Sequence, residues 1–362
     1  MSTTNLQSGS FRSTSVLSEE LRHSPTYWSH ISAPTAPSAV SEQERQSLLR
    51  QYGNFTLAFS IAVQRHLEYF GDASGVIAFR RRRGLIFALG DPLCAPQNRH
   101  ALLARFIKKY RRPSFVQITR STAESLQALG FWVNEIGVDT RLNLSTYDFK
   151  GKDKEWLRYA DNWTARRGFR VEEFSLVERE AEVAALSEEW RASRLIKRKE
   201  VRFLNRPIVM LDEPDVRRFG CFAPDGRLEA FVSFDPLFDS GSVIGFTSCI
   251  KRRHPDSNRY AEHVIMKKAI EQFQREGVSW VTLGLSPLAN IEDREFRANR
   301  WLSGWLRYYY RAGWINRKYY HLIGHADYKR RFQGDEEKVY YASPVRFNGI
   351  RLLTLASLCG IF

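Results

Sequence analysis

The order of apolar and polar positions predicts short strands and helices in close succession from about residue 41 onward. The polar stretch 41–50 favours a helix. The apolar run 55–63 fits a buried strand, with a helix as the alternative, because short apolar runs do not distinguish the two. Residues 75–92 hold two β-favouring runs around a charged turn, which predicts a hairpin with Arg80 to Arg83 at its exposed tip.

Similar patterns continue to residue 285 and predict a layered α/β protein. We expect helices over 100–109, 121–129, 152–167, 177–196 and 257–276, and strands over 114–118, 131–144, 170–174, 217–234, 243–250 and 278–285. Because strands and helices alternate over such short intervals, helices layered on a sheet are the expected architecture. No exact repeat is visible, and the 362 residues are enough for two domains.

Two end segments differ from this pattern. Residues 1–40 are rich in Ser, Thr and Pro and have no sustained period, which predicts a disordered tail. Residues 346–362 combine many apolar side chains with two arginines. This amphipathic segment is expected either to lie in a membrane interface or to pack on the body of the protein.

Composition indicates which kinds of binding partner and which cellular compartment to expect. Lysine and arginine total 55 against 40 acidic residues, a net charge of +15, so we expect a polyanionic partner, either RNA or an anionic lipid surface. The four cysteines are scattered and form no CxxC pair, which predicts a reducing, cytoplasmic setting without a metal site. No signal pattern and no apolar stretch of roughly 20 residues is present, so the chain is expected to be soluble or peripheral.

Several motifs follow one another in a characteristic order. They are Leu89-Gly-Asp-Pro-Leu, Leu129-Gly-Phe, Leu142-Asn-Leu-Ser-Thr-Tyr-Asp-Phe-Lys-Gly-Lys, Leu157-Arg-Tyr-Ala-Asp-Asn-Trp-Thr-Ala-Arg-Arg-Gly-Phe, Arg253-His-Pro, Leu283-Gly-Leu-Ser-Pro-Leu-Ala and Tyr328-Lys-Arg-Arg-Phe. Over about residues 52–344, this series resembles the soluble catalytic region of the bacterial lysyl- and alanyl-phosphatidylglycerol synthases.

The resemblance implies two tandem GNAT-like acyltransferase units, each a mixed sheet flanked by helices, in residues 41–145 and 146–345. The second unit would be the catalytic one. The resemblance also implies an aminoacyl-tRNA donor, a lipid acceptor with a hydroxyl or related nucleophile, and neither a metal nor another cofactor. The large membrane-embedded domain that usually precedes this region in the family is not among these residues.

One position departs from the family's pattern. The family has an acidic residue three positions before an arginine of the second unit, whereas Cys249 stands before Arg252 here. If that acid deprotonates the acceptor, another group must act in this chain. Asp235 is our candidate, with Asp239 beside it, because a carboxylate can serve as a general base. The alternative is that both are turn residues on either side of Pro236.

The other candidate catalytic residues are Arg252, Arg253, His254 and Ser286. The first three precede the helix 257–276, whose N-terminus favours an anion such as a phosphate. The alternative is a solvated basic turn. Ser286 offers a hydroxyl at the end of a strand where Gly284 permits close approach to the donor. The alternative is a strand followed by an ordinary proline turn.

Lys329, Arg330 and Arg331 complete the candidate donor site. They follow the aromatic and basic stretch 301–320, and this combination suits phosphates and the stacked bases of a tRNA acceptor end. Against this, Trp301, Trp305, Tyr308 and Tyr309 have helical spacing, which favours a stripe that faces the core.

Three functions remain open on the sequence alone. The leading hypothesis is transfer of an aminoacyl group from aminoacyl-tRNA to a phosphatidylglycerol-like lipid or a small-molecule acceptor, at the inner face of the cell membrane. The second is a GNAT acyltransferase that uses acyl-coenzyme A or an acyl carrier protein, because a fold does not fix its substrate. The third is a non-catalytic module that binds tRNA or a membrane.

Overall fold

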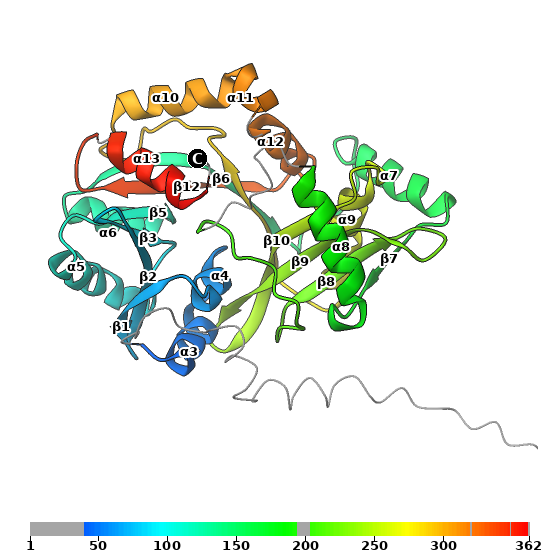
Figure 1. Ribbon diagram of the computed structural model, residues 1–362, viewed down its shortest axis with the longest axis horizontal. Helices are drawn as coiled ribbons and strands as arrows, with labels where there is room; N and C mark the ends of the chain where they lie inside the picture. The colour runs from blue at the N-terminus through cyan, green and yellow to red at the C-terminus, as the bar shows by residue number, and fades with distance from the viewer. Residues whose placement is uncertain (1–39, 194–202, 319–320, 348, 361–362) are drawn as a thin grey trace, which may run out of the picture.

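The computed structural model describes residues 40–193, 203–318, 321–347 and 349–360, and these form one mixed sheet with helices on both faces (Figure 1). The sheet has 12 strands in the described residues. Eleven follow the order β1-β2-β3-β5-β12-β6-β11-β10-β9-β8-β7, and β4 (Leu93–Cys94) pairs with β2 at the side.

The first half of the sheet begins with an antiparallel meander. Strands β1 (Glu68–Asp72), β2 (Gly75–Arg82) and β3 (Leu85–Leu89) pair in sequence. Arg83 and Gly84 join the last two with φ angles of 50° and 74°, as a two-residue hairpin turn requires. The hairpin prediction is therefore confirmed. Helix α5 (Arg99–Lys109) then leads to β5 (Ser114–Ile118), which lies parallel to β3.

The second half repeats this order. Strands β7 (Arg170–Glu173), β8 (Arg217–Phe222), β9 (Leu228–Asp239) and β10 (Ser242–Arg253) are antiparallel neighbours. Helix α9 (Ala261–Arg275) then leads to β11 (Trp280–Pro287), which is parallel to β10. Two series of antiparallel strands, helix and parallel strand confirm the predicted fold class of two GNAT-like units.

Strands β6 (Trp132–Asn143) and β12 (Asp335–Ser343) join the two halves. β6 pairs with β11 along one edge and with β12 along the other. β12 comes from the end of the chain, yet it lies between β5 and β6. At Gly137, φ is +141° and an added Cβ would lie 2.3 Å from the Ser286 carbonyl oxygen, so β6 and β11 can approach only because this residue is glycine.

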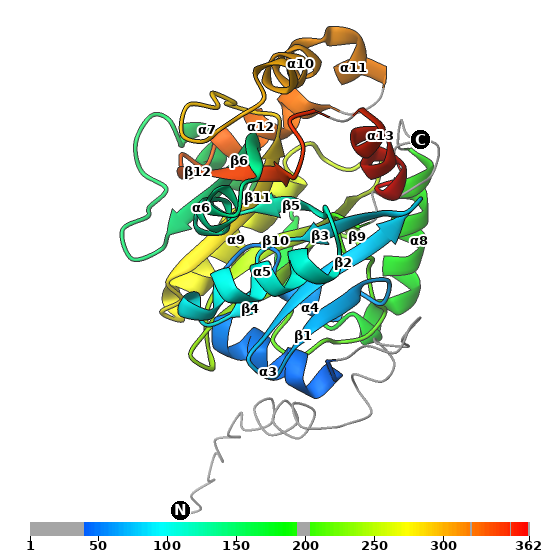
Figure 2. The same cartoon turned by 90° about the vertical axis from the view of Figure 1, so that its left-hand side faces the viewer.

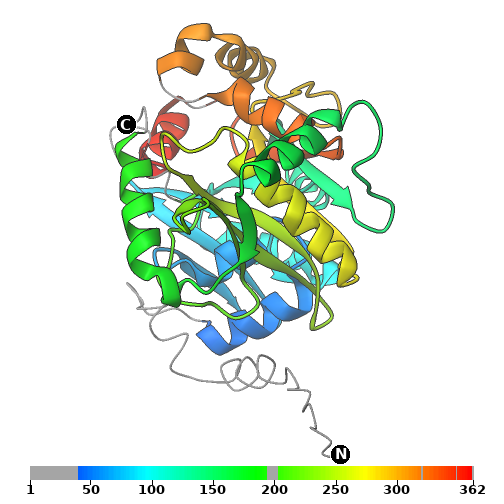
Figure 3. The same ribbon diagram turned by 90° about the vertical axis from the view of Figure 1, so that its right-hand side faces the viewer.

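Alternate residues of the strands supply cores on both faces. In β2, Val76 and Ala78 pack with α3 (Glu42–Tyr52) and α4 (Ala58–Val63), whereas Ile77 and Phe79 pack with α5 and α6 (Arg120–Ala128). In the second half, α9 covers one face together with α7 (Glu155–Arg166). Helix α8 (Glu180–Ala192), preceded by the short turn η2 (Val177–Arg179), covers the other face, as Figure 3 shows.

The remaining helices gather at one end of the molecule. Helix α10 (Arg300–Arg311) lies against β6 and is followed by α11 (Gly313–Lys318), and α12 (Leu322–Arg330) leads back to β11 (Figures 1 and 2). Helix α13 (Gly349–Leu358) follows β12 and packs through Arg351, Thr354 and Leu358. Among the described residues, none of the helices combines the length and apolar character that crossing a bilayer requires.

Three local predictions were wrong. Residues 58–63 form a helix rather than a strand, and all six are buried, so this helix has no polar face to reveal its period. The helix expected from residue 257 begins at Ala261. Asp235 and Pro236 lie inside β9, paired with Thr247 and Phe246, and do not form a turn.

The predicted core-facing stripe of α10 was also wrong. Trp301, Trp305, Tyr308 and Tyr309 are all exposed. The helix instead buries Leu302 and Ser303. Helical spacing identified a common face correctly but did not reveal that nothing in the described structure covers it.

Candidate functional site

The parallel strands β10 and β11 separate after a short pairing. Their register runs only from Gly245 opposite Trp280 to Thr247 opposite Thr282, although both strands continue further. The register between β11 and β6 shifts just after Thr282. We call the diverging segments, residues 248–253 of β10 and 283–287 of β11, the strand fork.

Lys329 at the end of α12 reaches the strand fork. Its Nζ donates hydrogen bonds of 2.6 Å to the carbonyl oxygens of Gly284 and Leu285. A Cβ placed on Gly284 would lie 3.7 Å from the Ser248 carbonyl oxygen of β10 and 3.9 Å from Lys329 Nζ. The amine therefore lies where the two strands part, and the backbone there has a φ of +78° at Gly284, which favours glycine.

The environment of Lys329 favours the neutral amine. Only 6% of the residue is exposed. Burial, reinforced by the positive charge of Lys251 and countered by Asp139, lowers the pKa of Lys329 from 10.5 to about 7. Two hydrogens of a neutral amine can serve the two carbonyl groups, which leaves its lone pair to accept a proton. A lysine in this state can act as an acid or a base near neutral pH.

Asp139 is the carboxylate whose charge acts on this lysine. It lies in β6, opposite Leu285 of β11, and is buried. Burial raises the pKa of Asp139, while a hydrogen bond from the Thr56 hydroxyl and the charge of Lys329 act in the opposite direction. Within the described residues, its Oδ1 accepts no hydrogen bond. Asp139 and Lys329 thus have pKa values shifted toward each other, which is typical of groups that exchange protons.

A chain of hydroxyl groups borders the fork on the side of the first unit. Thr56 Oγ1 also lies 3.3 Å from Thr282 Oγ1, and the hydroxyls of Thr282 and Thr247 are 2.5 Å apart. Lys251 of β10 lies on the other side, with its Nζ 4.4 Å from the ring centre of Tyr328. Burial lowers the pKa of Lys251 to about 8. The fork is therefore lined by groups that donate, accept or relay protons.

In the first half of the sheet, the corresponding parallel strands β3 and β5 stay joined by hydrogen bonds at their ends. β3 and β5 pair as far as Leu89 and Val116, and Gly90 N then donates to Val116 O at 2.9 Å. Just beyond, Asp91 accepts hydrogen bonds from the backbone N–H and the hydroxyl of Thr119 at 2.9 and 2.5 Å. These bonds hold the strand ends together, so the first half has no counterpart of the strand fork among the described residues.

The basic residues predicted before helix α9 lie apart from this cluster. Arg252 and Arg253 end β10 rather than open a helix. The Arg252 guanidinium stacks 3.8 Å from the ring centre of Trp190 in α8, and Arg253 pairs with Glu262 at 3.4 Å. His254 Nδ1 is 2.5 Å from Glu189. Adjacent strand residues face opposite sides, so Arg252 points toward α8 and Lys251 toward α12.

The other predicted donor-site residues are divided between the fork and the surface. Gly284, Ser286 and Lys329 come together at the fork, where Ser286 is buried opposite Val138 of β6. Arg330 is exposed and pairs with Asp327 at 2.8 Å. Arg331 lies 3.9 Å from the ring centre of Trp156. Only Arg330 and Arg331 therefore remain available to phosphates at the surface.

Asp235 is held in a buried ion network. Arg206 Nε and Nη2 donate to its carboxylate at 2.9 and 2.6 Å, and Arg206 Nη1 donates to Glu213 at 2.9 Å. A carboxylate bound in this way is a poor proton acceptor, so the structure argues against Asp235 as the base. Burial and the nearby Asp235 raise the pKa of the Cys249 thiol well above its ordinary value, so Cys249 does not replace the missing acid either.

Sequence reasoning missed Asp139, Thr56 and Lys251. A signal for Asp139 exists, because it is a carboxylate in the middle of a strand otherwise rich in buried residues. Lys251 adjoins Arg252 and was hidden in a run of positive charges. Thr56 carries no local signal, since a lone threonine beside an apolar run is ordinary.

Comparison with known proteins identifies the family to which this chain is related. Residues 46–343 match the family described as phosphatidylglycerol lysyltransferase, C-terminal. The phosphatidylglycerol lysyltransferase of Bacillus subtilis is 21% identical over 266 residues, which cover 71% of this chain and 30% of that protein. An uncharacterized protein of Corynebacterium glutamicum is 22% identical over 227 residues, which cover 60% of this chain and 28% of that protein. The chain thus spans less than a third of the length of these curated relatives.

A solved structure supports the same assignment at the level of the fold. The structure of L-PGS from Bacillus licheniformis superposes with a TM-score of 0.72 at 18% identity, covering 91% of this chain and 99% of that chain. Together with the match over residues 46–343, this agreement confirms the resemblance seen in the motifs. The chain belongs to the family of phosphatidylglycerol lysyltransferase C-terminal regions, a family of acyltransferases.

Proposed function

We propose that this protein transfers an aminoacyl group from aminoacyl-tRNA to a hydroxyl of a phosphatidylglycerol-like lipid, with Lys329 as the proton-transfer group. The observation that carries the proposal is the buried amine at the strand fork, with its pKa lowered to about 7, in a chain of this family. The proposed reaction needs no metal or other cofactor, because it exchanges one ester for another.

The proposed chemistry follows from the geometry of the fork. The neutral amine of Lys329 accepts the proton of the acceptor hydroxyl as its oxygen attacks the ester carbonyl carbon of the donor. The bond from that carbon to the terminal ribose oxygen then breaks. The ribose oxygen takes the proton back from Lys329, so the amine is regenerated. Asp139 stabilises the protonated amine between these steps, because it is a buried acid coupled to the same site.

The charges around the fork suit an anionic donor. Net charge is +15, and Arg330 and Arg331 follow the catalytic lysine at the surface. We propose that these two arginines contact tRNA phosphates, and that the exposed Arg253 at the end of β10 binds a phosphate of either substrate, whereas Arg252 is buried against Trp190. The proposed place of action is the cytoplasmic face of the cell membrane, where charged tRNA and lipid meet.

A salt series tests the donor. Affinity for aminoacyl-tRNA should fall steeply and log-linearly with salt as phosphate contacts release counterions, and acyl-coenzyme A should show a shallow dependence. Arg330→Ala with Arg331→Ala should flatten the slope for tRNA. Arg166→Ala with Arg170→Ala, two exposed arginines of the second unit, is the matched control.

Turnover decides between the donors. Mass spectrometry of lipid extracts after incubation with aminoacyl-tRNA and phosphatidylglycerol should detect the aminoacylated lipid. Turnover with acyl-coenzyme A or an acyl carrier protein, together with unproductive tRNA binding, would replace the proposed donor by a thioester. Binding of tRNA without turnover of any donor would favour a non-catalytic module.

A further inference from the structure

Large apolar side chains that remain exposed gather in one part of the molecule. In the part of the chain that the structure describes, ten such side chains are exposed, and only Tyr159 and Val177 lie elsewhere. The other eight are Trp301, Trp305, Tyr308, Tyr309, Trp314, Phe347, Ile350 and Leu353. We call these eight the aromatic surface.

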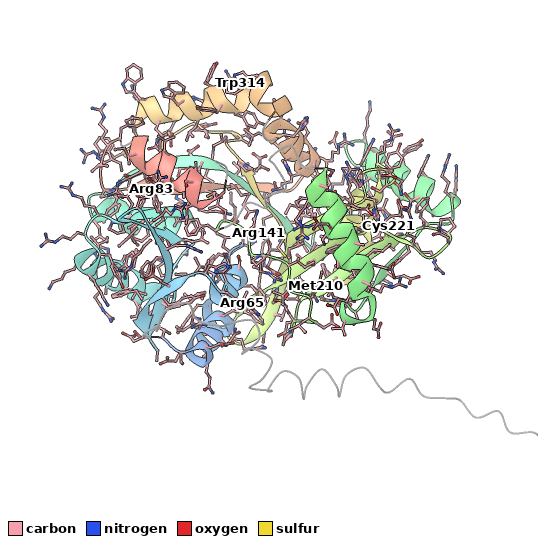
Figure 4. All side chains as sticks on the ribbon, in the orientation of Figure 1. Arg65, Arg83, Arg141, Met210, Cys221 and Trp314 are labelled. Atoms are coloured by element: carbon pink, nitrogen blue, oxygen red, sulfur yellow. The ribbon has the colours of Figure 1, made fainter. Side chains whose placement is uncertain are left out.

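The helices that carry the aromatic surface belong to the same end of the protein. Figures 1 and 3 show α10 and α11 with α13 beside them at this end. Asn299, which caps α10, donates a hydrogen bond of 2.7 Å to the carbonyl oxygen of Arg346, just ahead of α13. Figure 4 shows Trp314 at the outer edge of the molecule.

Helix α10 has three different sides. Leu302 and Ser303 are buried, and Leu306 packs beside them. Trp301, Trp305 and Tyr308, spaced four and three residues apart, form a stripe on a second side, and Trp301 is 74% exposed. Arg300, Arg307 and Arg311 occupy the third side and are also exposed. The aromatic stripe is thus flanked by positive charge rather than packed into the core.

Helix α13 packs on the core through Leu352, Leu355 and Leu358, but it also buries polar side chains and exposes apolar ones. Its inward side carries Arg351, whose Nη1 donates to Ser114 Oγ at 3.1 Å, together with buried Thr354. Its outward side carries Ile350 and Leu353, which are 71% and 61% exposed. Exposing such a row of apolar side chains to water is unfavourable, which indicates that another surface covers these side chains.

The two segments that carry the aromatic surface contain no acidic residue. Residues 300–318 hold five arginines and lysines, residues 344–362 hold two, and neither segment has an aspartate or glutamate. The tip of the β2–β3 hairpin adds positive charge, since Arg82 Nη2 donates to Ser357 of α13 at 3.4 Å and Arg83 lies beside it (Figure 4). The partner of the aromatic surface should therefore be negatively charged.

We propose that the aromatic surface docks on an anionic phospholipid bilayer, with its rings at the level of the headgroups and the neighbouring arginines on lipid phosphates. Exposed Trp and Tyr beside Arg is the composition of a helix that lies in a membrane interface. The aliphatic Ile350 and Leu353 decide against RNA, because RNA-binding surfaces use aromatic rings to stack on bases. The proposal rests on the proposed function in that it identifies the surface that brings the lipid acceptor to the enzyme.

Vesicle binding by the full chain tests this surface. The protein is sedimented with vesicles of phosphatidylcholine alone or mixed with phosphatidylglycerol. Trp301→Ala with Trp305→Ala should lower the partition coefficient about tenfold or more, because two interfacial rings are lost. Tyr159→Ala with Val177→Ala, the two exposed apolar residues outside the surface, should leave it unchanged. Arg307→Gln with Arg311→Gln should reduce the preference for phosphatidylglycerol.

A second readout separates this proposal from the proposed function. Transfer to a short-chain phosphatidylglycerol dispersed in water should survive Trp301→Ala with Trp305→Ala, while transfer to vesicles should fall. The docking surface would be overturned if the tryptophan variant bound vesicles as well as the Tyr159→Ala with Val177→Ala variant does. It would also be overturned if the tryptophan variant lost tRNA binding while its vesicle binding stayed unchanged. Absence of transfer with any lipid, combined with vesicle binding through the tryptophans, would overturn the proposed function and leave the docking surface intact.

Discussion

Lys329→Met removes the buried amine and keeps an unbranched side chain of similar length. We expect this substitution to lower the transfer rate by about 10²–10⁴-fold, the usual contribution of a general acid or base. The wild-type kcat/KM should rise with pH through an apparent pKa of about 7, because the neutral amine is the active form. The residual activity of the variant should lack this rise.

The same substitution should change how stability depends on pH. The pKa of Lys329 is about 7 in the fold and 10.5 in the unfolded chain, a difference that corresponds to at most about 5 kcal/mol. Between these values the unfolded chain binds more protons, so the stability of the wild type rises with pH, whereas below about 7 the full penalty is present. From about pH 7 to pH 9 the wild type should gain about 2 kcal/mol relative to the variant.

Urea denaturation at the two pH values measures this gain, and an aminoacyl-tRNA transfer assay measures the rate. Lys338→Met is the control, because Lys338 pairs with Glu135 at 3.1 Å outside the fork. Its pH–rate profile should match the wild type. If Lys329→Met transferred the aminoacyl group at the wild-type rate, the assignment of Lys329 as the proton-transfer group would be refuted. An identical pH dependence of unfolding in the variant and the wild type would refute it as well.

Three other substitutions or deletions test further parts of the structure. Asp139→Asn should move the acid limb of the pH–rate profile to lower pH, because it removes the charge that raises the pKa of Lys329; an unmoved limb would contradict the coupling. Arg206→Met should cost about 3–5 kcal/mol in urea denaturation, because it leaves two buried carboxylates unpaired, whereas Arg120→Met in an exposed pair should stay near the wild type. Deletion of residues 1–39 should preserve a cooperative thermal transition by circular dichroism, whereas a deletion that includes Val40 should not, because buried Val40 accepts a hydrogen bond from Arg45.

Local sequence patterns were sufficient to predict those elements that depend on neighbouring residues alone. The hairpin at Arg83 and Gly84 has a charged turn between two apolar runs, and its prediction was confirmed. Helix α4 was given only as the alternative to a strand, because it is buried on all sides and therefore shows no period. The exposed face of α10 was misjudged because spacing shows which residues share a face, and covering by other elements is a tertiary property.

The chemical core of the site was only partly predictable. Lys329 was found within a run of three basic residues, and charge gave no means of separating the buried lysine from the surface arginines. Its burial results from the path of α12, which ends against the carbonyl oxygens of β11. Asp139 became visible only through the pairing of β6 with β11, which joins segments about 145 residues apart.

The proposed mechanism uses groups from both units. Asp139 and Thr56 belong to residues 41–145, whereas Lys329, Lys251 and Thr282 belong to residues 146–345. β6 carries Asp139 to the fork because it pairs with β11 on one edge, and β12 holds the other edge of β6 in place. The first unit, whose own strand ends are closed around Asp91, therefore supplies Asp139 and the Thr56 hydroxyl to the fork. A second unit produced alone would retain Lys329 but lose Asp139, whose charge opposes the lowering of the lysine's pKa by burial, so the proposed proton transfer depends on the junction between the units.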